Sequence, residues 1–295
     1  MTAGRVVVVL GGDIRDRSEA IGDLLLADGG TALVLTAHPS AVDARLDTSD
    51  EGPVEVRADD PVARLEAYRS GATDPDDDVL AALTTGSDAP LAAVLGWEYA
   101  RRAAAAGAWD VVVIELDGDL AAVRRIAATG ELAAFVESRW PAHVRFSSMA
   151  AGDRADLRVQ EAHRLSLMAG DVTDFLAGPV EVLVLGASPE RTARLAALAR
   201  GAVTPEVTPD GEGGFRATLA VPDPPTAPIT VEGDRLRLEL DGFRAALPLP
   251  PLLARCILVD SVHDGDAGAV VASFVPDPAL WPAHLVPTGS ADRTG

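Results

Sequence analysis

Lysine and asparagine are absent from this chain of 295 residues, and glutamine occurs once, at Gln160. All 25 basic side chains are therefore arginines. A P-loop lysine, a Schiff-base lysine and a lysine general base each need an ε-ammonium group, so these chemistries are excluded. Arginine cannot replace lysine as a base, because its guanidinium group stays protonated in proteins.

Cysteine is nearly absent as well. The single Cys256 excludes an intramolecular disulfide and a cysteine-based metal site, and its apolar surroundings at residues 254–259 predict a buried core thiol. No run of about 18 apolar residues occurs that could span a membrane. Residues 1–12 also lack the basic segment and long apolar core of a signal peptide. We therefore expect a soluble, cytoplasmic protein.

Acidic side chains outnumber basic ones by 45 to 25, which gives a formal net charge of −20. This charge argues against unaided binding to the phosphates of nucleic acids. Hydrophobic residues make up 48% of the chain, which is enough for a packed core. The length suits one large domain with a small companion.

Strands and helices alternate over the first two thirds of the sequence. Helices are expected from residue 14 to about residue 28, over 62–69, 79–83 and 88–107, after the strand at 111–116 through residue 136, over 156–176, and from about residue 189. Apolar, mostly β-branched runs predict strands at 5–10, 31–36, 111–116 and 180–186, and a short strand is expected at 54–57. This alternation predicts an α/β fold with a doubly wound, mostly parallel sheet over residues 1–204.

The character of the sequence changes after residue 204. A linker at 204–214 is followed by short predicted strands at 215–221, 235–240, 245–249, 256–262 and 269–274. Prolines at positions 222, 224, 225 and 228 fit turns and sheet edges. We therefore predict a small all-β sandwich over residues 205–276 and a loosely ordered tail over 277–295.

A series of motifs, in order, resembles a known ATPase family. Residues 10–17 read LGGDIRDR after a strand, residues 31–39 read TALVLTAHP, and residues 108–115 read AWDVVVIE. Arg124, ESRWP at 137–141 and VLVLGASPER at 182–191 follow. This series resembles the deviant Walker A loop, the Walker B strand and later motifs of the arsenite-pump (ArsA) and tail-anchored-protein-targeting ATPases. Residues 234–249 are similar to the α-crystallin-like module of some bacterial members.

The resemblance implies a P-loop-like fold whose phosphate-binding loop is degenerate. Gly11 and Gly12 remain at the loop, but Arg15 stands at the position of the P-loop lysine and Asp16 at that of the magnesium-binding threonine. A P-loop directs unhindered backbone N–H groups at phosphate. Ile14 adds a Cβ where the family has a third glycine, and a carboxylate at Asp16 would repel the phosphates.

Other positions of the family's nucleotide site also differ. By the resemblance, His38 and Arg45 replace two of its aspartates, Glu115 replaces the Walker B aspartate, and no asparagine can reach an adenine. We therefore expect a pseudo-ATPase without catalytic residues or a resident cofactor. ATP with magnesium enters only under an alternative, in which Arg15 holds phosphate and Glu115 or Asp119 holds the metal.

Carboxylates cluster at the end of one central predicted strand. Glu115, Asp117 and Asp119 lie where α/β sheets bind ligands, and their oxygens would suit magnesium or calcium. We favour a simpler interpretation, in which Asp117 or Asp119 caps the next helix. His38 ends the second strand and could act as an acid or base, although an ordinary loop histidine is the favoured reading.

Apolar residues also mark the segment where the targeting ATPases build a groove for their clients. Their helical spacing is typical of core residues rather than of a groove. The residues are Phe135, Trp140, Phe146, Leu165, Leu167 and Met168.

Together these features predict a binding or scaffold subunit. The resemblance implies an active ArsA-like ATPase paralogue as its partner, or a second copy of the chain in a dimer. A chaperone-like module that binds apolar peptide segments is a further alternative.

Overall fold

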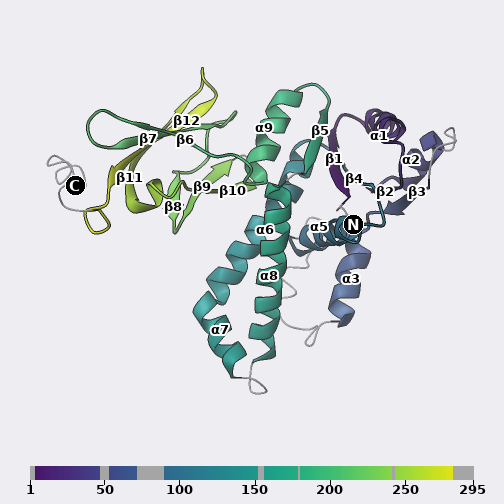
Figure 1. Ribbon diagram of the computed structural model, residues 1–295, viewed down its shortest axis with the longest axis horizontal. Helices are drawn as coiled ribbons and strands as arrows, with labels where there is room; N and C mark the ends of the chain where they lie inside the picture. Colours follow the sequence, from purple (N-terminus) through teal and green to yellow (C-terminus); the bar gives the residue numbers. More distant parts are fainter. Residues whose placement is uncertain are drawn as a thin grey trace. The chain divides into compact units, whose positions relative to one another are not determined.

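The computed structural model describes residues 4–46, 53–71, 90–151, 156–178, 180–240 and 243–281. Two compact units contain these residues, Met1–Ala193 and Arg194–Gly295, and Figure 1 shows their elements. The boundary expected after residue 204 stays a prediction. The helix expected at 79–83 and residues 282–295 of the expected tail lie outside the described residues.

A five-stranded parallel sheet forms the centre of the first unit (Figure 1), in the order β3-β2-β4-β1-β5. The near-continuous burial of β1, β2 and β4 fits their β-branched sequences, since parallel strands are covered on both faces. The α/β class and the parallel sheet are thus confirmed. The strands are β1 Arg5–Gly11, β2 Ala32–Thr36, β3 Val54–Ala58, β4 Val111–Leu116 and β5 Glu181–Leu185.

Helices cover this sheet and extend beyond it. Ile21 and Leu25 of α1 pack on one face of the sheet with Val7 and Val9. The described helices are α1 Ile14–Asp28, α2 Pro39–Leu46, α3 Pro61–Gly71, α5 Pro90–Ala105, α6 Leu120–Arg139, α7 Ala142–Ala150, α8 Leu157–Ala177 and α9 Pro189–Ala199. None of them is both long and apolar enough to cross a bilayer.

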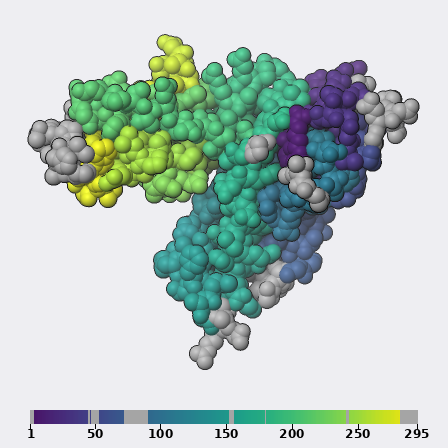
Figure 2. Space-filling view, viewed as in Figure 1, coloured from purple at the N-terminus to yellow at the C-terminus, as the bar shows by residue number. Residues whose placement is uncertain are grey.

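Helices α6, α7 and α8 form a structure that we call the helical arm. α6 and α8 run side by side, and α7 lies at their far end (Figure 1). Figure 2 shows the arm in blue-green, projecting from the layer that contains the sheet. Helix α7 was not predicted. Pro141 precedes it and separates it from α6, because proline cannot continue the hydrogen-bond ladder of a helix.

The second unit is antiparallel and contains two described sheets, β11-β12-β7-β6 and β10-β9-β8. Inward side chains alternate with outward ones along β9 and β10, as their sequences predict. The strands are β6 Glu206–Pro209, β7 Phe215–Ala220, β8 Thr230–Glu232, β9 Arg235–Leu240, β10 Phe243–Pro248, β11 Cys256–Asp264 and β12 Ala269–Pro276.

Three details of this unit differ from the sequence predictions. Strand β6 lies inside the expected linker and β8 was missed, because both are too short and too exposed to give a period-2 pattern. Cys256 is half-buried at the start of the edge strand β11 and is not a core residue. Burial still raises the pKa of its thiol.

Candidate functional site

The loop between β1 and α1 makes a tight turn against the end of β5. Gly11 has a φ of +78° and Gly12 a φ of +63°, in the region that favours glycine. A Cβ on Gly11 would lie 2.3 Å from the carbonyl oxygen of Leu185. Both glycines are therefore required by the fold of this loop, whether or not a ligand binds there.

Two carboxylates occupy the start of α1, where a phosphate-binding loop would offer its N–H groups. Asp13 is the N-cap, and its Oδ1 accepts hydrogen bonds from the backbone nitrogens of Arg15 at 2.8 Å and Asp16 at 2.9 Å. Asp16 Oδ2 accepts from the nitrogen of Asp13 at 3.1 Å, which completes a capping box. The side chains of Arg15 and Asp16 are both exposed, so Asp16 caps the helix and Arg15 points to solvent.

Arg17 fills the space under this loop and was not recognised from the sequence. Its side chain is 1% exposed. Its Nη1 donates to the carbonyl oxygen of Gly12 at 2.8 Å, its Nε to Glu115 Oε1 at 2.5 Å and its Nη2 to Asp117 Oδ1 at 2.6 Å. The loop therefore directs a carbonyl oxygen at an internal cation.

Glu115, at the end of β4, is the buried counter-charge of this cation. It is 1% exposed, and its second oxygen accepts a hydrogen bond from the hydroxyl of Thr36 on β2. The same hydroxyl oxygen accepts from the backbone nitrogen of His38 at 2.9 Å. Both oxygens of the carboxylate are thus engaged, as a buried charge requires.

Asp117, Asp119 and His38 lie at the exposed side of this network. His38 Nε2 is 3.8 Å from Asp117 Oδ2, with both side chains partly in water. Asp119 directly precedes α6, but its backbone is helical and its side chain makes no capping hydrogen bond. The cap predicted at Asp119 is therefore wrong, because a capping side chain needs an extended backbone at that residue.

The metal site suggested for Glu115, Asp117 and Asp119 stays a prediction. Within the described ranges, no three His, Cys, Asp or Glu side chains are arranged to hold a metal ion. Glu115 would have to exchange Arg17 and Thr36 for the metal.

A second buried charge cluster lies beside the first. Asp59, which follows β3, is 6% exposed and forms ion pairs with Arg64 of α3 and Arg125 of α6. Burial lowers the pKa of Arg64 and of Arg125 to about 10, and the charge of Glu115 opposes this for Arg125. Both guanidinium groups stay protonated at neutral pH. Arg124, which the family resemblance matched, is exposed.

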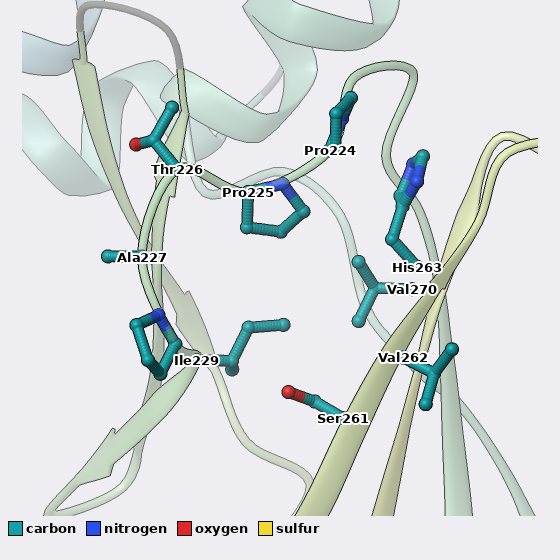
Figure 3. Close-up of a pocket in the computed structure, with 10 residues that line it drawn as sticks. Pro224, Pro225, Thr226, Ala227, Ile229, Ser261, Val262, His263 and Val270 are labelled. Carbon is teal, nitrogen blue, oxygen red and sulfur yellow. The ribbon is translucent and has the colours of Figure 1, made fainter.

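The second unit contains a cavity of about 360 Å³ that the sequence did not indicate. Figure 3 shows it between the proline-rich segment before β8 and the strands β11 and β12. Pro224, Pro225, Ile229 and Val270 give it an apolar lining. His263 lies at its rim, with Nε2 3.1 Å from the carbonyl oxygen of Val221. Ser261 and His263 add polar groups, so the lining is mixed.

Apolar side chains are exposed along the helical arm. Leu165 is buried, as its spacing predicted, whereas the core interpretation is wrong for Phe146 and Leu167. Among the described rings, Phe146 packs against His163 in a T-shaped contact, with the ring centroids 5.7 Å apart. The exposed fractions are 63% for Phe146, 45% for Met149, 52% for Leu157 and 58% for Leu167.

No family model matches the chain. A search of curated proteins finds similarity to an uncharacterized protein of Streptomyces coelicolor. The two are 34% identical over 109 residues, which cover 33% of this chain and 27% of that protein. The match thus spans little more than a quarter of the relative's length, and it bears on neither family nor activity.

Proposed function

We propose that this chain is a nucleotide-independent binding or scaffold subunit, a pseudo-ATPase related to the ArsA-type ATPases. One observation carries the proposal: the Arg17 guanidinium occupies the space under the β1–α1 loop and is bound by the loop itself. The adjacency of β1 and β4 supports the relationship, because it brings this loop to the acidic end of β4. The relationship also leads us to propose a cytoplasmic location.

The polarity of the loop is opposite to what phosphate binding needs. A phosphate-binding loop aims N–H groups at the anion, and a lysine neutralises the remaining charge. Here the carbonyl oxygen of Gly12 accepts from Arg17, and the first N–H groups of α1 donate to Asp13 and Asp16. A triphosphate would have to break these bonds, and the negative charges of Asp13 and Asp16 would repel its phosphates.

The alternative of an active ATPase with a rearranged site requires two changes. Arg15 would have to turn from solvent towards the loop, and Glu115 would have to leave Arg17 to bind magnesium. Removing the partner of a buried charge costs about 3–5 kcal/mol, which such a site would need to recover from the nucleotide.

Calorimetric titration of the full chain with ATP and magnesium tests the proposal. We expect no saturable heat and no thermal shift up to millimolar nucleotide. The matched variant R15K/D16T restores two letters of the P-loop motif but keeps Arg17, so it should also fail to bind. Saturable binding of micromolar nucleotide by the wild type would overturn the proposal.

A partner with an intact nucleotide site is the natural complement of such a subunit. We propose an ArsA-like ATPase paralogue in this role. We expect titration of the chain with that paralogue to give a stable complex. The rate of ATP hydrolysis by the paralogue is then measured with and without the chain. If the paralogue does not bind the chain, and its rate of ATP hydrolysis does not change when the chain is added, the paralogue is excluded as the partner.

The exposed side chains of the helical arm favour a second candidate function, the binding of apolar peptide segments. Their exposed fractions leave an apolar surface that a client could cover. In the second unit, two antiparallel sheets and the cavity of Figure 3 support the expected α-crystallin-like sandwich as a further binding module.

Suppression of client aggregation tests this candidate. We expect the full chain to slow the aggregation of a denatured client protein and F146D/L167D to lose most of this effect. L26D is the matched control, because Leu26 is 51% exposed on α1, away from the arm. Equal suppression by both variants would remove the arm as the binding surface.

A further inference from the structure

The cavity of Figure 3 lies between two parts of the second unit. The proline-rich segment before β8 supplies Pro225 and Ile229, and the β11–β12 hairpin supplies Ser261, His263 and Val270. Figure 3 shows Pro225 and Ile229 pointing into the cavity from one side, with Val270 and the hydroxyl of Ser261 on the other. The volume of about 360 Å³ is at the lower end of the range for small-molecule sites.

The apolar walls of the cavity suit an aromatic ring. Three of the lining residues are prolines, Pro224, Pro225 and Pro228, and proline-rich segments elsewhere pack their rings against aromatic side chains. No Phe, Tyr or Trp is among the lining residues, and Pro224 and Pro228 are exposed. Ile229 and Val270 are only 7% and 1% exposed, so the surrounding core holds these two aliphatic side chains in place.

Two polar groups on β11 suit a hydrogen-bond donor. Ser261 and His263 are two residues apart and therefore face the same side of the strand. Because the carbonyl oxygen of Val221 can only accept, His263 Nε2 carries the hydrogen of their 3.1 Å contact, and Nδ1 is then an acceptor in the neutral imidazole. Among the described residues, neither Nδ1 nor the hydroxyl of Ser261 has a hydrogen-bond partner. A ligand group with several N–H donors matches both.

The charge around the cavity selects the sign of that group. None of the lining residues is Arg, Asp or Glu. Asp260 and Asp264 flank the segment Ser261–His263 in the chain, and among the described residues their carboxylates accept only backbone hydrogen bonds. These two negative charges, on a chain with a net charge of −20, favour a cation at the rim of the cavity and disfavour an anion.

We propose that this cavity binds a small aromatic amine. The ring of the ligand lies against the prolines, Ile229 and Val270, and its ammonium group at the rim donates hydrogen bonds to His263 Nδ1 and Ser261 Oγ. The positive charge of the ammonium group is attracted by the carboxylates that flank these two residues. The cavity lies wholly within the second unit, so the proposal stands whether or not the first unit binds nucleotide or the helical arm binds a peptide.

Calorimetric titration of the full chain with three indole compounds tests the proposal. Tryptamine carries an ammonium group, indole has no charge, and indole-3-acetate is an anion. We expect saturable binding of tryptamine, about ten-fold weaker binding of indole because the charge-assisted hydrogen bonds are lost, and no binding of indole-3-acetate. If tryptamine does not bind at millimolar concentration, or binds no better than indole or indole-3-acetate, the proposal is wrong.

Variants test whether the cavity is the binding site. S261A/H263F removes both acceptors and should lower the affinity for tryptamine to that for indole, while the affinity for indole itself stays within about two-fold. D260N/D264N keeps the shape of the rim but removes its charge, and it should weaken the binding of tryptamine even if S261A/H263F does not fold. The control is H143F, since His143 is exposed on α7 in the other unit. Wild-type affinity for tryptamine in a folded S261A/H263F, or in D260N/D264N, would overturn the proposal.

Discussion

Side chains have opposite environments at the carboxyl end of the parallel sheet and on the helical arm. At the sheet end, Arg17 of α1 and Glu115 of β4, both about 1% exposed, pair with each other and with polar groups of the β1–α1 loop and β2. On the arm, apolar side chains such as Phe146 lie in water without a described cover. The chain's own Arg17 thus lies at the end of the sheet where α/β folds usually bind ligands, and exposed apolar side chains lie on the arm instead.

This contrast shows that position in a fold does not make a site. A polar site can bind a ligand when its donors, acceptors and charges still lack partners, and here Arg17 pairs with the buried carboxylate of Glu115 and with the loop carbonyl of Gly12. An apolar surface binds a partner when water is released from it. Variants that disrupt the charged network at the end of the sheet, or that change the apolar surface of the arm, test this contrast.

Loss of the Glu115 charge should have the largest effect. E115Q keeps the size of the side chain but leaves the Arg17 cation buried beside a neutral amide. We expect a loss of about 3 kcal/mol in the free energy of unfolding, measured by urea denaturation. The control is E181Q, which breaks an ion pair that is about half exposed and should cost less than about 1 kcal/mol. Equal losses of unfolding free energy in E115Q and E181Q would show that burial does not make the Arg17–Glu115 pair more important for stability.

Gly11 should be the next most sensitive position. In G11A, a non-glycine residue at a positive φ costs about 1–2 kcal/mol, and contact with the Leu185 carbonyl adds to this. The matched control is G29A, where φ is +55° and no atom lies near the new Cβ, so only the conformational cost applies. Thermal denaturation should place G11A below G29A, and the reverse order would contradict the crowded loop.

Glu98 on α5 should make stability depend on pH. Burial raises its pKa, but hydrogen bonds from Arg101 and Arg102 lower it by more, so the pKa lies below its ordinary value of 4.5. The carboxylate therefore contributes stability that is fully present above the unfolded-state pKa and is lost as pH falls through the folded-state pKa. We expect E98Q to cost about 1–2 kcal/mol at pH 7.

The pH dependence itself distinguishes this origin from a loss of packing. The difference in unfolding free energy between the wild type and E98Q should shrink steadily as the pH falls below about 4.5, because the wild-type carboxyl then becomes neutral as well. If the difference stays constant down to pH 3, the lower stability of E98Q comes from altered packing and not from the lost charge.

Phe146 should show the smallest effect on stability. F146D replaces an exposed ring on the arm, and we expect a change within about 0.5 kcal/mol in urea denaturation. The same variant should lower the binding of an apolar fluorescent dye. A large loss of stability would mean that the arm closes over this ring, and the contrast between the two regions would disappear.

Much of the fold was predictable because its local signals agree. Uninterrupted valine and leucine runs predicted β1, β2 and β4, and alternation predicted β9 and β10. Elements without such a signal were missed, among them α7, which follows Pro141, and the short strand β8. Sequence also placed Glu115 and Asp117 at the correct end of the sheet.

The central residue of the site was missed although a signal existed. Arg17 lies three residues after Ile14 and four before Ile21, on the apolar face of its own helix. A charge on that face needs a buried partner, and Glu115, at the end of an otherwise apolar strand, is the complementary case. The motif comparison directed attention to Arg15, which occupies the lysine position in the sequence but points to solvent.

The sequence by itself determined the main strands and helices and the chemistry that is excluded, because hydrophobic period and residue type are local properties. The absence of lysine, for example, excluded a P-loop lysine, a Schiff-base lysine and a lysine general base. Only the tertiary structure decided that Arg17 closes the loop, since its partner Glu115 is 98 residues away in the chain. The exposure of Phe146 belongs to the same class: whether a side chain is covered depends on what packs against it, and that is a property of the whole fold.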